Sequence, residues 1–308
     1  MIVPPYLQQG DTVALIAPAR FMDMSVISHF EKWVVSNGWI LKQSPNLGQK
    51  DNQLGGNPQK RLSDIIWALQ DQEIKAVFMA RGGYGTMQLL SELRKIDFTQ
   101  FPKWWVGFSD ITALHITLQQ QGMASLHGPM AMQFDSNTKC STKSRKELAG
   151  RLKGAPLHFE VDASVVSGLP QRMINSKIKN TEFSAPLWGG NLSMIFAMLA
   201  SGAKWPSTPF VLFIEDLDEY LYHIDRMMQA LDLSGLLESS VAVMVGSMSD
   251  MHDNASPFGK NAKEIVMNIC EKHNKPLIWG LPCGHEADNV ALKLGFDITF
   301  DGNNLIQS

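Results

Sequence analysis

Cysteine is scarce in this sequence, and long apolar runs are absent. The three cysteines, Cys140, Cys270 and Cys283, lie far apart and form no Cys-x-x-Cys pair. They indicate neither a disulfide framework nor a zinc knuckle, and they suit a reducing compartment. No stretch approaches the roughly 18 uninterrupted apolar residues of a membrane-spanning helix. We therefore expect a protein of a reducing compartment without a membrane segment.

A strong excess of charge of one sign is also missing. The 27 Lys and Arg face 30 Asp and Glu, which gives a formal net charge of -3, and no basic block is present. These features argue against a nucleic-acid partner, because binding to phosphates needs clustered positive charge. With 44% hydrophobic residues, 19% charged residues and only 15 prolines, disorder and collagen-like structure are excluded.

One apolar segment near the start, residues 13–19, could be mistaken for an export signal because it contains Ala17-Pro18-Ala19. Nothing basic precedes the segment, Asp11 lies just ahead of it, and Pro18 interrupts the pair of small residues. We therefore interpret it as a buried strand.

The 308 residues suggest about two domains, although one large α/β domain would also fit. Apolar runs and helical periodicity alternate through the first half, which predicts a parallel sheet with helices on both faces. The expected strands cover 12–17, a short run near 40, 76–80 and 104–108, and the expected helices cover 23–37, a segment from 57, a segment through 89–93 and 111–120.

The second half begins after an irregular segment that suits a connector. Regular patterns return from Gly189, with strands expected at 210–214, 241–245, near 277 and within 291–300, and helices at 224–231 and 262–270. We therefore expect an amino-terminal α/β domain at 1–154, a linker at 155–183 and a smaller carboxyl-terminal α/β domain at 184–308.

Ligands of open parallel sheets bind beyond the carboxyl ends of the strands, so residues directly after strands are the informative ones. Four such positions stand out, at 81–85, 107–110, 215–216 and 284–285. Ser109 follows a strand and precedes a helix, where a sharp turn can expose a nucleophilic hydroxyl. The pattern differs from Gly-x-Ser-x-Gly because Ile111 replaces the second glycine. A helix-capping role for Ser109 is the alternative.

A serine nucleophile needs a base and an acid that orients the base. His285 is the best-placed base, since Pro282-Cys283-Gly284 forms a tight loop before it, and Glu215 at the end of an apolar strand is the candidate acid. A salt bridge is the alternative role for Glu215. We interpret His115 as a core or surface residue, and His127 and His223 remain possible pocket residues.

The glycine-rich segment 81–85 could cradle a phosphate, but it lacks the spacing of the known phosphate-binding loops. Paired glycines could instead supply amides to an oxyanion hole, and Arg81 could hold a substrate carboxylate. His285 and Asp288 alone do not make a metal site, so we expect neither a metal nor another cofactor.

Taken together, these segments resemble the LD-carboxypeptidases, the muramoyltetrapeptide carboxypeptidase family of serine peptidases. The motifs that carry the resemblance span the chain in order: Arg81-Gly82-Gly83-Tyr84-Gly85, Val106-Gly107-Phe108-Ser109-Asp110, Gly189-Gly190-Asn191-Leu192, Ile214-Glu215-Asp216 with Ile224-Asp225-Arg226, and Gly284-His285-x-x-Asp288-Asn289. The opening, Pro5 to Pro18, is also similar to the start of that family.

The resemblance implies that Ser109 is the nucleophile, His285 the general base and Glu215 the acid that orients it. It implies an oxyanion hole built from the amides of Gly83 and Asp110. The serine would lie in an amino-terminal domain with a parallel sheet, and the other two residues in a carboxyl-terminal domain with a mixed, barrel-like sheet. The resemblance also implies a cytoplasmic homodimer. Members of the family remove the terminal D-alanine from murein tetrapeptides in cell-wall recycling, and we expect the same reaction here. The candidate substrate-binding residues within the motifs are Arg81, Tyr84 and Asn191.

Two other functions stay open. The microcin C self-immunity peptidases share the serine motif and cleave peptidyl or aminoacyl adenylates, and Trp188 could stack on a base as in that branch, although a packing role is the alternative. A peptide-binding or sugar-binding module without catalysis would not need Ser109, Glu215 and His285 together. Their joint presence favours an enzyme, and the modest length favours the murein substrate.

Overall fold

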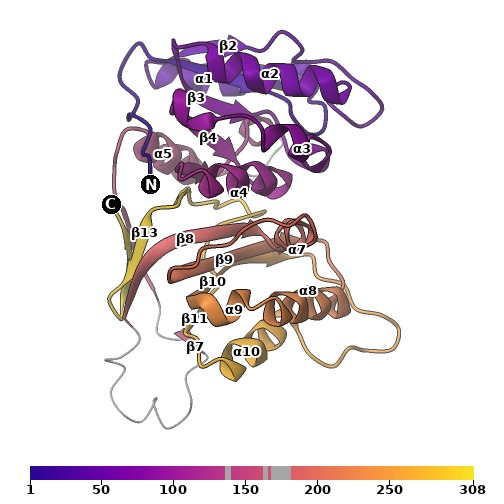
Figure 1. Cartoon of the computed structure of the whole chain (residues 1–308). Coiled ribbons are helices and arrows are strands. Elements are labelled where there is room, and N and C mark those ends of the chain that lie inside the picture. The colour runs from indigo at the N-terminus through magenta and orange to yellow at the C-terminus, as the bar shows by residue number, and fades with distance from the viewer. Residues whose placement is uncertain (136–139, 162–165, 168–181) are drawn as a thin grey trace. The chain divides into compact units, whose positions relative to one another are not determined.

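The structure of the protein is a computed structural model that describes residues 1–135, 140–161, 166–167 and 182–308 (Figure 1). The chain forms two compact units. Unit 1 consists of Met1–Ala155 and Ala287–Gly295, and unit 2 of Pro156–Glu286 and Phe296–Ser308. Residues 287–295, which the sequence pattern placed with the carboxyl-terminal domain, therefore belong to unit 1. Most of the expected linker, at 162–165 and 168–181, lies outside the described residues.

Unit 1 is built on a six-stranded sheet with the order β12-β5-β4-β3-β1-β2. Five strands are parallel, and β12 runs antiparallel to β5, with Leu292 opposite His127. The bounds of the strands are β1 (Thr12–Ile16), β2 (Ile40–Gln43), β3 (Ile74–Met79), β4 (Trp104–Gly107), β5 (Ser125–His127) and β12 (Leu292–Leu294).

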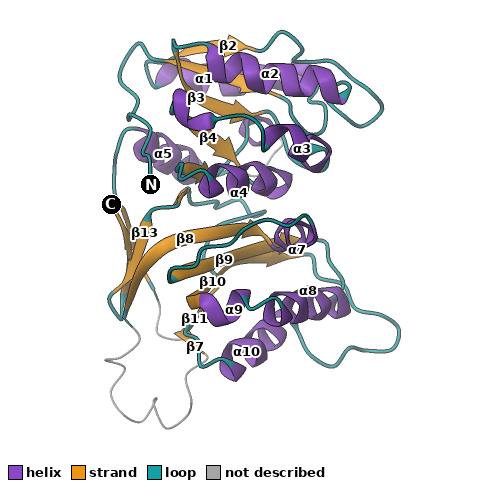
Figure 2. Ribbon diagram, viewed as in Figure 1, coloured by secondary structure: helices purple, strands orange, loops and turns teal. Residues whose placement is uncertain are grey.

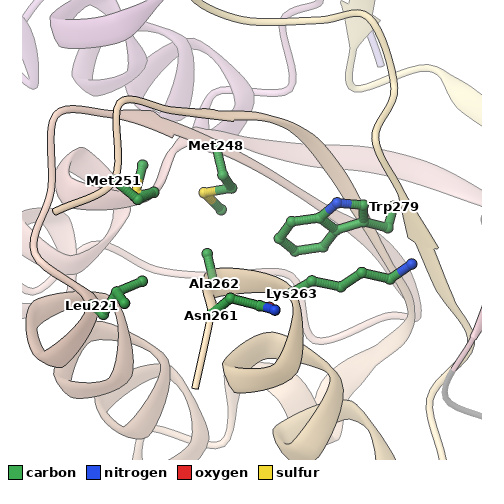
Figure 3. Close-up of a pocket in the computed structure, with 7 residues that line it drawn as sticks. All are labelled: Leu221, Met248, Met251, Asn261, Ala262, Lys263 and Trp279. Carbon is green, nitrogen blue, oxygen red and sulfur yellow. The ribbon is translucent and has the colours of Figure 1, made fainter. Parts of the chain in front are cut away.

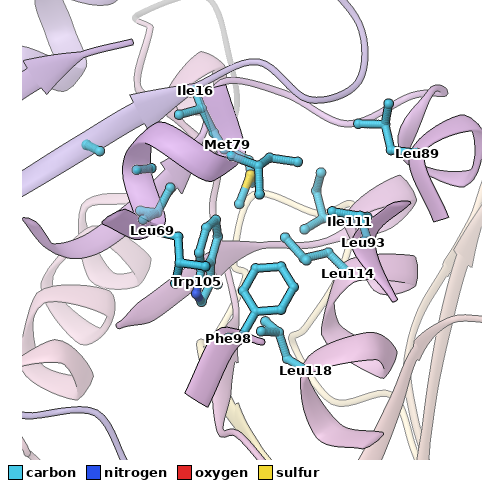
Figure 4. Packing of buried hydrophobic residues seen from close by; sticks show 14 of the residues in the cluster. Ile16, Leu69, Met79, Leu89, Leu93, Phe98, Trp105, Ile111, Leu114 and Leu118 are labelled. Atoms are coloured by element: carbon cyan, nitrogen blue, oxygen red, sulfur yellow. The ribbon is translucent and has the colours of Figure 1, made fainter. Parts of the chain in front are cut away.

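Helices cover both faces of this sheet. On one face, α2 (Pro58–Gln70), α3 (Leu90–Leu93) and α4 (Thr112–Gln120) bury their apolar sides against strand residues such as Met79 and Trp105 (Figure 4). On the other face, α1 (Ile27–Ser36) places Phe30 against Phe78, with ring centroids 5.0 Å apart. A further helix, α5 (Thr142–Leu152), follows later in the unit. The predicted start of α2 is confirmed, since the side chain of Asn57 accepts a hydrogen bond from the Lys60 amide and Pro58 takes the first helical position.

Unit 2 contains an eight-stranded mixed sheet with the order β6-β14-β13-β8-β9-β10-β11-β7. Its central strands β8 to β11 are parallel, and the strands at both ends are antiparallel to their neighbours. The strands are β6 (Leu157–Glu160), β7 (Val166–Ser167), β8 (Phe183–Asn191), β9 (Phe210–Leu217), β10 (Ser240–Ser249), β11 (Leu277–Trp279), β13 (Asp297–Phe300) and β14 (Asn304–Gln307). The helices are α7 (Leu192–Ala200), α8 (Leu221–Leu233), α9 (Leu236–Ser239) and α10 (Ala262–Lys272) (Figure 2).

The predicted fold class is confirmed: an α/β unit with a largely parallel sheet is joined to a second unit with a mixed, curled sheet. This architecture brings residues after neighbouring strands together, because the carboxyl ends of parallel strands share one edge. In unit 1 that edge collects residues after β1, β3 and β4. In unit 2 it collects residues at the ends of β8, β9, β10 and β11.

Candidate active site

Ser109 occupies a strained turn between β4 and α4. Its φ angle is 61°, in the left-handed region that residues other than glycine rarely adopt. It begins a short 3-10 helix, Ser109–Ile111, that leads directly into α4. The sharp turn expected here is therefore present, and strain of this kind is concentrated at functional positions.

The glycine-rich loop after β3 lies against this turn. A Cβ atom added to Gly82 would lie 3.1 Å from the Cβ of Ser109, so the two loops approach closely here and a side chain on Gly82 would require the Ser109 turn to shift by a few tenths of an ångström. Gly83 has a φ of 99°, which a side chain would strain. Tyr84 is 44% exposed. The structure thus brings Gly82 beside Ser109 and leaves the Tyr84 ring partly open to solvent.

Two buried charged side chains hold these loops in place. Asp110 accepts a hydrogen bond from the Thr86 amide at 2.8 Å, and burial raises its pKa although that hydrogen bond acts to lower it. Arg61 is fully buried and donates to the carbonyls of Pro18 at 2.7 Å and Gly85 at 2.9 Å. The sequence interpretation did not single out Arg61. Its spacing of four residues from Ile65, on the buried stripe of α2, is the signal that could have identified it.

His115 is a buried residue of the core of unit 1. Its ring nitrogens lie 2.9 Å from the Ser125 hydroxyl and 2.9 Å from the Gly107 carbonyl, and burial lowers its pKa to about 3. The ring is therefore neutral at ordinary pH and links α4 to β4 and β5. His127 is also buried, with its ring against Phe108 at 5.6 Å.

Unit 2 brings Glu215 and His285 together. Glu215 lies near the end of β9 and is completely buried, and its Oε2 is 2.7 Å from Nδ1 of His285 in the loop after β11. Burial alone would lower the pKa of His285, but the hydrogen bond and charge of Glu215, together with the charges of Asp216 and Glu286, outweigh it and raise that pKa. The carboxylate thus fixes Nδ1 as a proton donor and leaves Nε2 for other chemistry.

Ser247 and two glycines shape the loop that carries His285. The Ser247 hydroxyl accepts a hydrogen bond from the His285 amide at 2.9 Å. A Cβ atom on Gly284 would lie 2.8 Å from Oε2 of Glu215, and one on Gly246 would lie 2.3 Å from the Cys283 carbonyl. Sequence reasoning missed Ser247, although the pair Gly246-Ser247 directly follows an apolar strand and could have drawn attention.

Asn191 and Asp216 form a buried polar pair beside Glu215. Asn191 donates to Oδ1 of Asp216 at 2.8 Å and also caps α7 by accepting from the Met194 amide. Burial and the charge of Glu215 raise the pKa of Asp216 to about 6. The side chain of Asn191 therefore has a structural role in unit 2.

Unit 2 also contains Trp188 and His223, which the sequence analysis considered as a base-stacking residue and a pocket residue. Trp188 is 8% exposed, with its ring near that of Trp205, so it is a packing residue. His223 pairs with Glu219 at 2.6 Å.

Unit 2 also has a pocket of about 390 Å³ beside the carboxyl ends of β10 and β11 (Figure 3). Its lining is mainly apolar, with one lysine: Leu221, Met248, Met251, Asn261, Ala262, Lys263 and Trp279. Ser109, Glu215 and His285 do not line it. Within the described part of the chain, no three His, Cys, Asp or Glu side chains are grouped as metal ligands. No helix in that part is long and apolar enough to cross a membrane.

Comparison with known proteins identifies the class to which this fold and these residues belong. Residues 13–128 match the LD-carboxypeptidase N-terminal domain, and residues 184–300 match the LD-carboxypeptidase C-terminal domain. The chain therefore belongs to the LD-carboxypeptidase family, and the prediction of a serine-type carboxypeptidase is confirmed.

Particular relatives agree with this assignment. The chain is 28% identical to the probable murein peptide carboxypeptidase of Bacillus subtilis, over 95% of this chain and 89% of that protein. It is 28% identical to the murein tetrapeptide carboxypeptidase of Pseudomonas aeruginosa, over 95% and 94%. A putative carboxypeptidase of Streptomyces coelicolor is 30% identical over 80% and 78%.

Solved structures share the fold. The muramoyltetrapeptide carboxypeptidase of Oxalobacter formigenes matches with a TM-score of 0.83 and 23% identity, covering 96% of this chain and 98% of that one. The microcin C7 self-immunity protein in complex with aspartyl sulfamoyl adenosine matches with a TM-score of 0.83 and 18% identity, covering 100% and 98%. The fold alone therefore does not separate the two substrate classes.

Proposed function

We propose that this enzyme hydrolyses the bond between an L-centre and the terminal D-alanine of a murein tetrapeptide, in cell-wall recycling. The observation that carries the proposal is the 2.7 Å hydrogen bond between buried Glu215 and Nδ1 of His285, because it orients an imidazole as a general base. The strained turn at Ser109 supports a nucleophile there. The likeness to the murein tetrapeptide carboxypeptidase of Pseudomonas aeruginosa supports the substrate.

In the proposed reaction, the Ser109 hydroxyl attacks the carbonyl carbon of the scissile bond while Nε2 of His285 takes its proton. The amides of Gly83 and Asp110 stabilise the oxyanion that forms, and Glu215 stabilises the imidazolium. His285 then protonates the leaving nitrogen, and D-alanine departs. Water, deprotonated by His285, hydrolyses the acyl-enzyme and restores the hydroxyl. Unit 1 supplies the nucleophile and unit 2 supplies the base and acid.

A second candidate is cleavage of peptidyl or aminoacyl adenylates, which the likeness to the microcin C7 self-immunity protein supports. The burial of Trp188 counts against it, because a buried ring offers no face to a base. The family resemblance also underlies the proposal that the enzyme is a cytoplasmic homodimer.

Incubation with murein tetrapeptide and with an adenylated peptide in parallel tests the proposal. We expect D-alanine release from the tetrapeptide and no cleavage of the adenylate. The Ser109→Ala variant should lose turnover on the order of a millionfold, with an unchanged circular dichroism spectrum. Ser91→Ala, which removes an exposed hydroxyl of α3, is the matched control and should keep full activity. Near wild-type release of D-alanine by Ser109→Ala would end the proposal.

A further inference from the structure

The sheet of unit 1 has a switch point between β1 and β3. These neighbours are parallel, but the chain leaves them towards opposite faces: α1 packs Phe30 on Phe78, whereas Leu89 after β3 packs with Met79. Adjacent strand residues point to opposite faces, so Phe78 and Met79 mark the two sides. Ligands of doubly wound sheets bind where the connections diverge in this way.

Two arginines lie at this switch point. Arg20 follows β1 and Arg81 follows β3, and both side chains are partly buried. The Nε atoms of both are shielded from solvent and have no hydrogen-bond partner among the described residues. No carboxylate of the described chain forms an ion pair with either guanidinium. Burial lowers the pKa of Arg81, and the charge of Arg20 lowers it further, so the two cations repel one another.

Arg61 shows what an arginine with a purely structural role looks like in the same loops. It donates to three carbonyls, of Gly56, Pro18 and Gly85, and to the side chain of Gln88. Two partly buried like charges without a counter-ion are unfavourable, and an anion held between them would remove that penalty. The difference from Arg61 points to a ligand for Arg20 and Arg81.

The contacts place this pair close to the nucleophile. The Arg20 side chain passes Gly83 so closely that a Cβ atom there would lie 2.6 Å from its Cδ, and a Cβ atom on the neighbouring Gly82 would lie 3.1 Å from the Cβ of Ser109. The scissile nitrogen of a carboxypeptidase substrate is bonded to the carbon that bears the terminal carboxylate. A carbonyl at Ser109 therefore puts that carboxylate within a short distance of the loop that carries Gly83.

We propose that Arg20 and Arg81 together bind the terminal carboxylate of the substrate and so restrict the enzyme to free peptide ends. The inference rests on the proposed function and extends it to the recognition of the chain end. Planar guanidinium groups bind carboxylates through paired N–H donors, which suits this task better than a lysine would. Both residues act by binding and positioning the substrate.

Binding is measured in the Ser109→Ala background, so that no turnover is needed. Titration calorimetry compares murein tetrapeptide with the same peptide ending in D-alanine amide. We expect the parent, the Ser109→Ala protein, to bind the peptide with a free carboxylate (the acid) more tightly than the amide. Arg20→Gln and Arg81→Gln should each weaken binding of the acid by roughly ten- to hundredfold, since hydrogen bonds to charged groups contribute about 1.5–3 kcal/mol. Binding of the amide should stay within about threefold in all variants. Arg94→Gln, an exposed arginine of unit 1, is the control for the change in net charge and should preserve the preference.

The outcomes separate this inference from the proposed function. A parent that binds acid and amide equally, or binds neither, overturns the inference, and so does an acid preference that survives both Arg→Gln changes. The nucleophile is tested separately in the wild-type enzyme with a fluorophosphonate probe that carries no carboxylate. If the probe labels Ser109 but the preference for the acid does not depend on the arginines, the proposed function stands and the carboxylate site is contradicted. An arginine-dependent preference with unlabelled Ser109 supports the carboxylate site and contradicts the serine mechanism.

Discussion

Glu215 and His285 are 70 residues apart in the sequence, and they meet in the fold through one hydrogen bond of 2.7 Å. Replacement of Glu215 by Gln keeps the shape of the side chain and removes its charge. We expect turnover to fall by roughly ten-thousand-fold with little change in substrate binding, because the carboxylate stabilises the imidazolium of the transition state. Steady-state kinetics on murein tetrapeptide give both quantities. Glu219→Gln, which alters the pairing with His223, is the control and should stay near wild type.

The pH dependence of the same variant provides a second measurement. His285 must be neutral to accept a proton, so wild-type kcat/KM falls as pH drops through its pKa, which Glu215 raises. In Glu215→Gln the hydrogen bond and charge of Glu215 are gone, and only the charges of Asp216 and Glu286 still oppose the effect of burial on the pKa of His285. The acidic limb should therefore move to lower pH. Turnover within about threefold of wild type, together with an unmoved acidic limb, would assign Glu215 a structural role.

Candidate catalytic residues could be predicted from the sequence where they follow strongly apolar strands. Ser109, Glu215 and His285 all do so, which is why strand-end reasoning selected them. Arg61 and Ser247 lie at positions that the local pattern marks as unusual, but their partners are backbone groups of other loops, and the local sequence does not identify those partners. The pairing of Arg20 with Arg81 escaped prediction for the same reason, because it depends on which two strands are neighbours.

At the scale of elements, the loop from β11 to His285 offers a matched pair of glycines. Gly280 has a φ of 83° and Gly284 a φ of 123°, so alanine strains the backbone at both positions. A Cβ atom on Gly280 meets nothing within 4 Å, whereas one on Gly284 would lie 2.4 Å from the Ser247 hydroxyl and 2.8 Å from Oε2 of Glu215.

We expect Gly284→Ala to lose activity by at least roughly a hundredfold, because a displacement of about 1 Å in a catalytic group has that effect. Gly280→Ala should lose stability alone, by about 1–2 kcal/mol from the left-handed backbone. Thermal unfolding and D-alanine release measured on both variants separate the two effects. Equal activity in the two variants would show that the packing around Gly284 does not position His285.

Helices with a clear hydrophobic periodicity were predicted well, whereas strands that are short or lack a regular hydrophobic pattern were not. The helices α1, α2, α4, α8 and α10 carry clear apolar stripes, and all were expected. The strand β5 has three residues, and the first part of β8, from Phe183, contains Pro186 and precedes Gly189, where the regular pattern was expected to return. Such segments become strands because neighbouring strands pair with them, which is tertiary information.

The whole enzyme should work without a metal, since the proposed chemistry uses a hydroxyl, an imidazole and backbone amides. We expect treatment with a chelator, followed by desalting, to leave the rate of D-alanine release unchanged. Activity that is lost to the chelator and regained with zinc would indicate that His285 and Asp288 act as ligands.

The return of residues 287–295 to unit 1 determines when this protein can finish folding during its synthesis. Strand β5 is bordered on one side by β12, whose residues come from positions 292–294. When the first 155 residues have left the ribosome, that side of β5 is still an open edge, with backbone groups that can pair with other strands. The half of the enzyme that is made first can therefore be completed only when almost the whole chain has been translated.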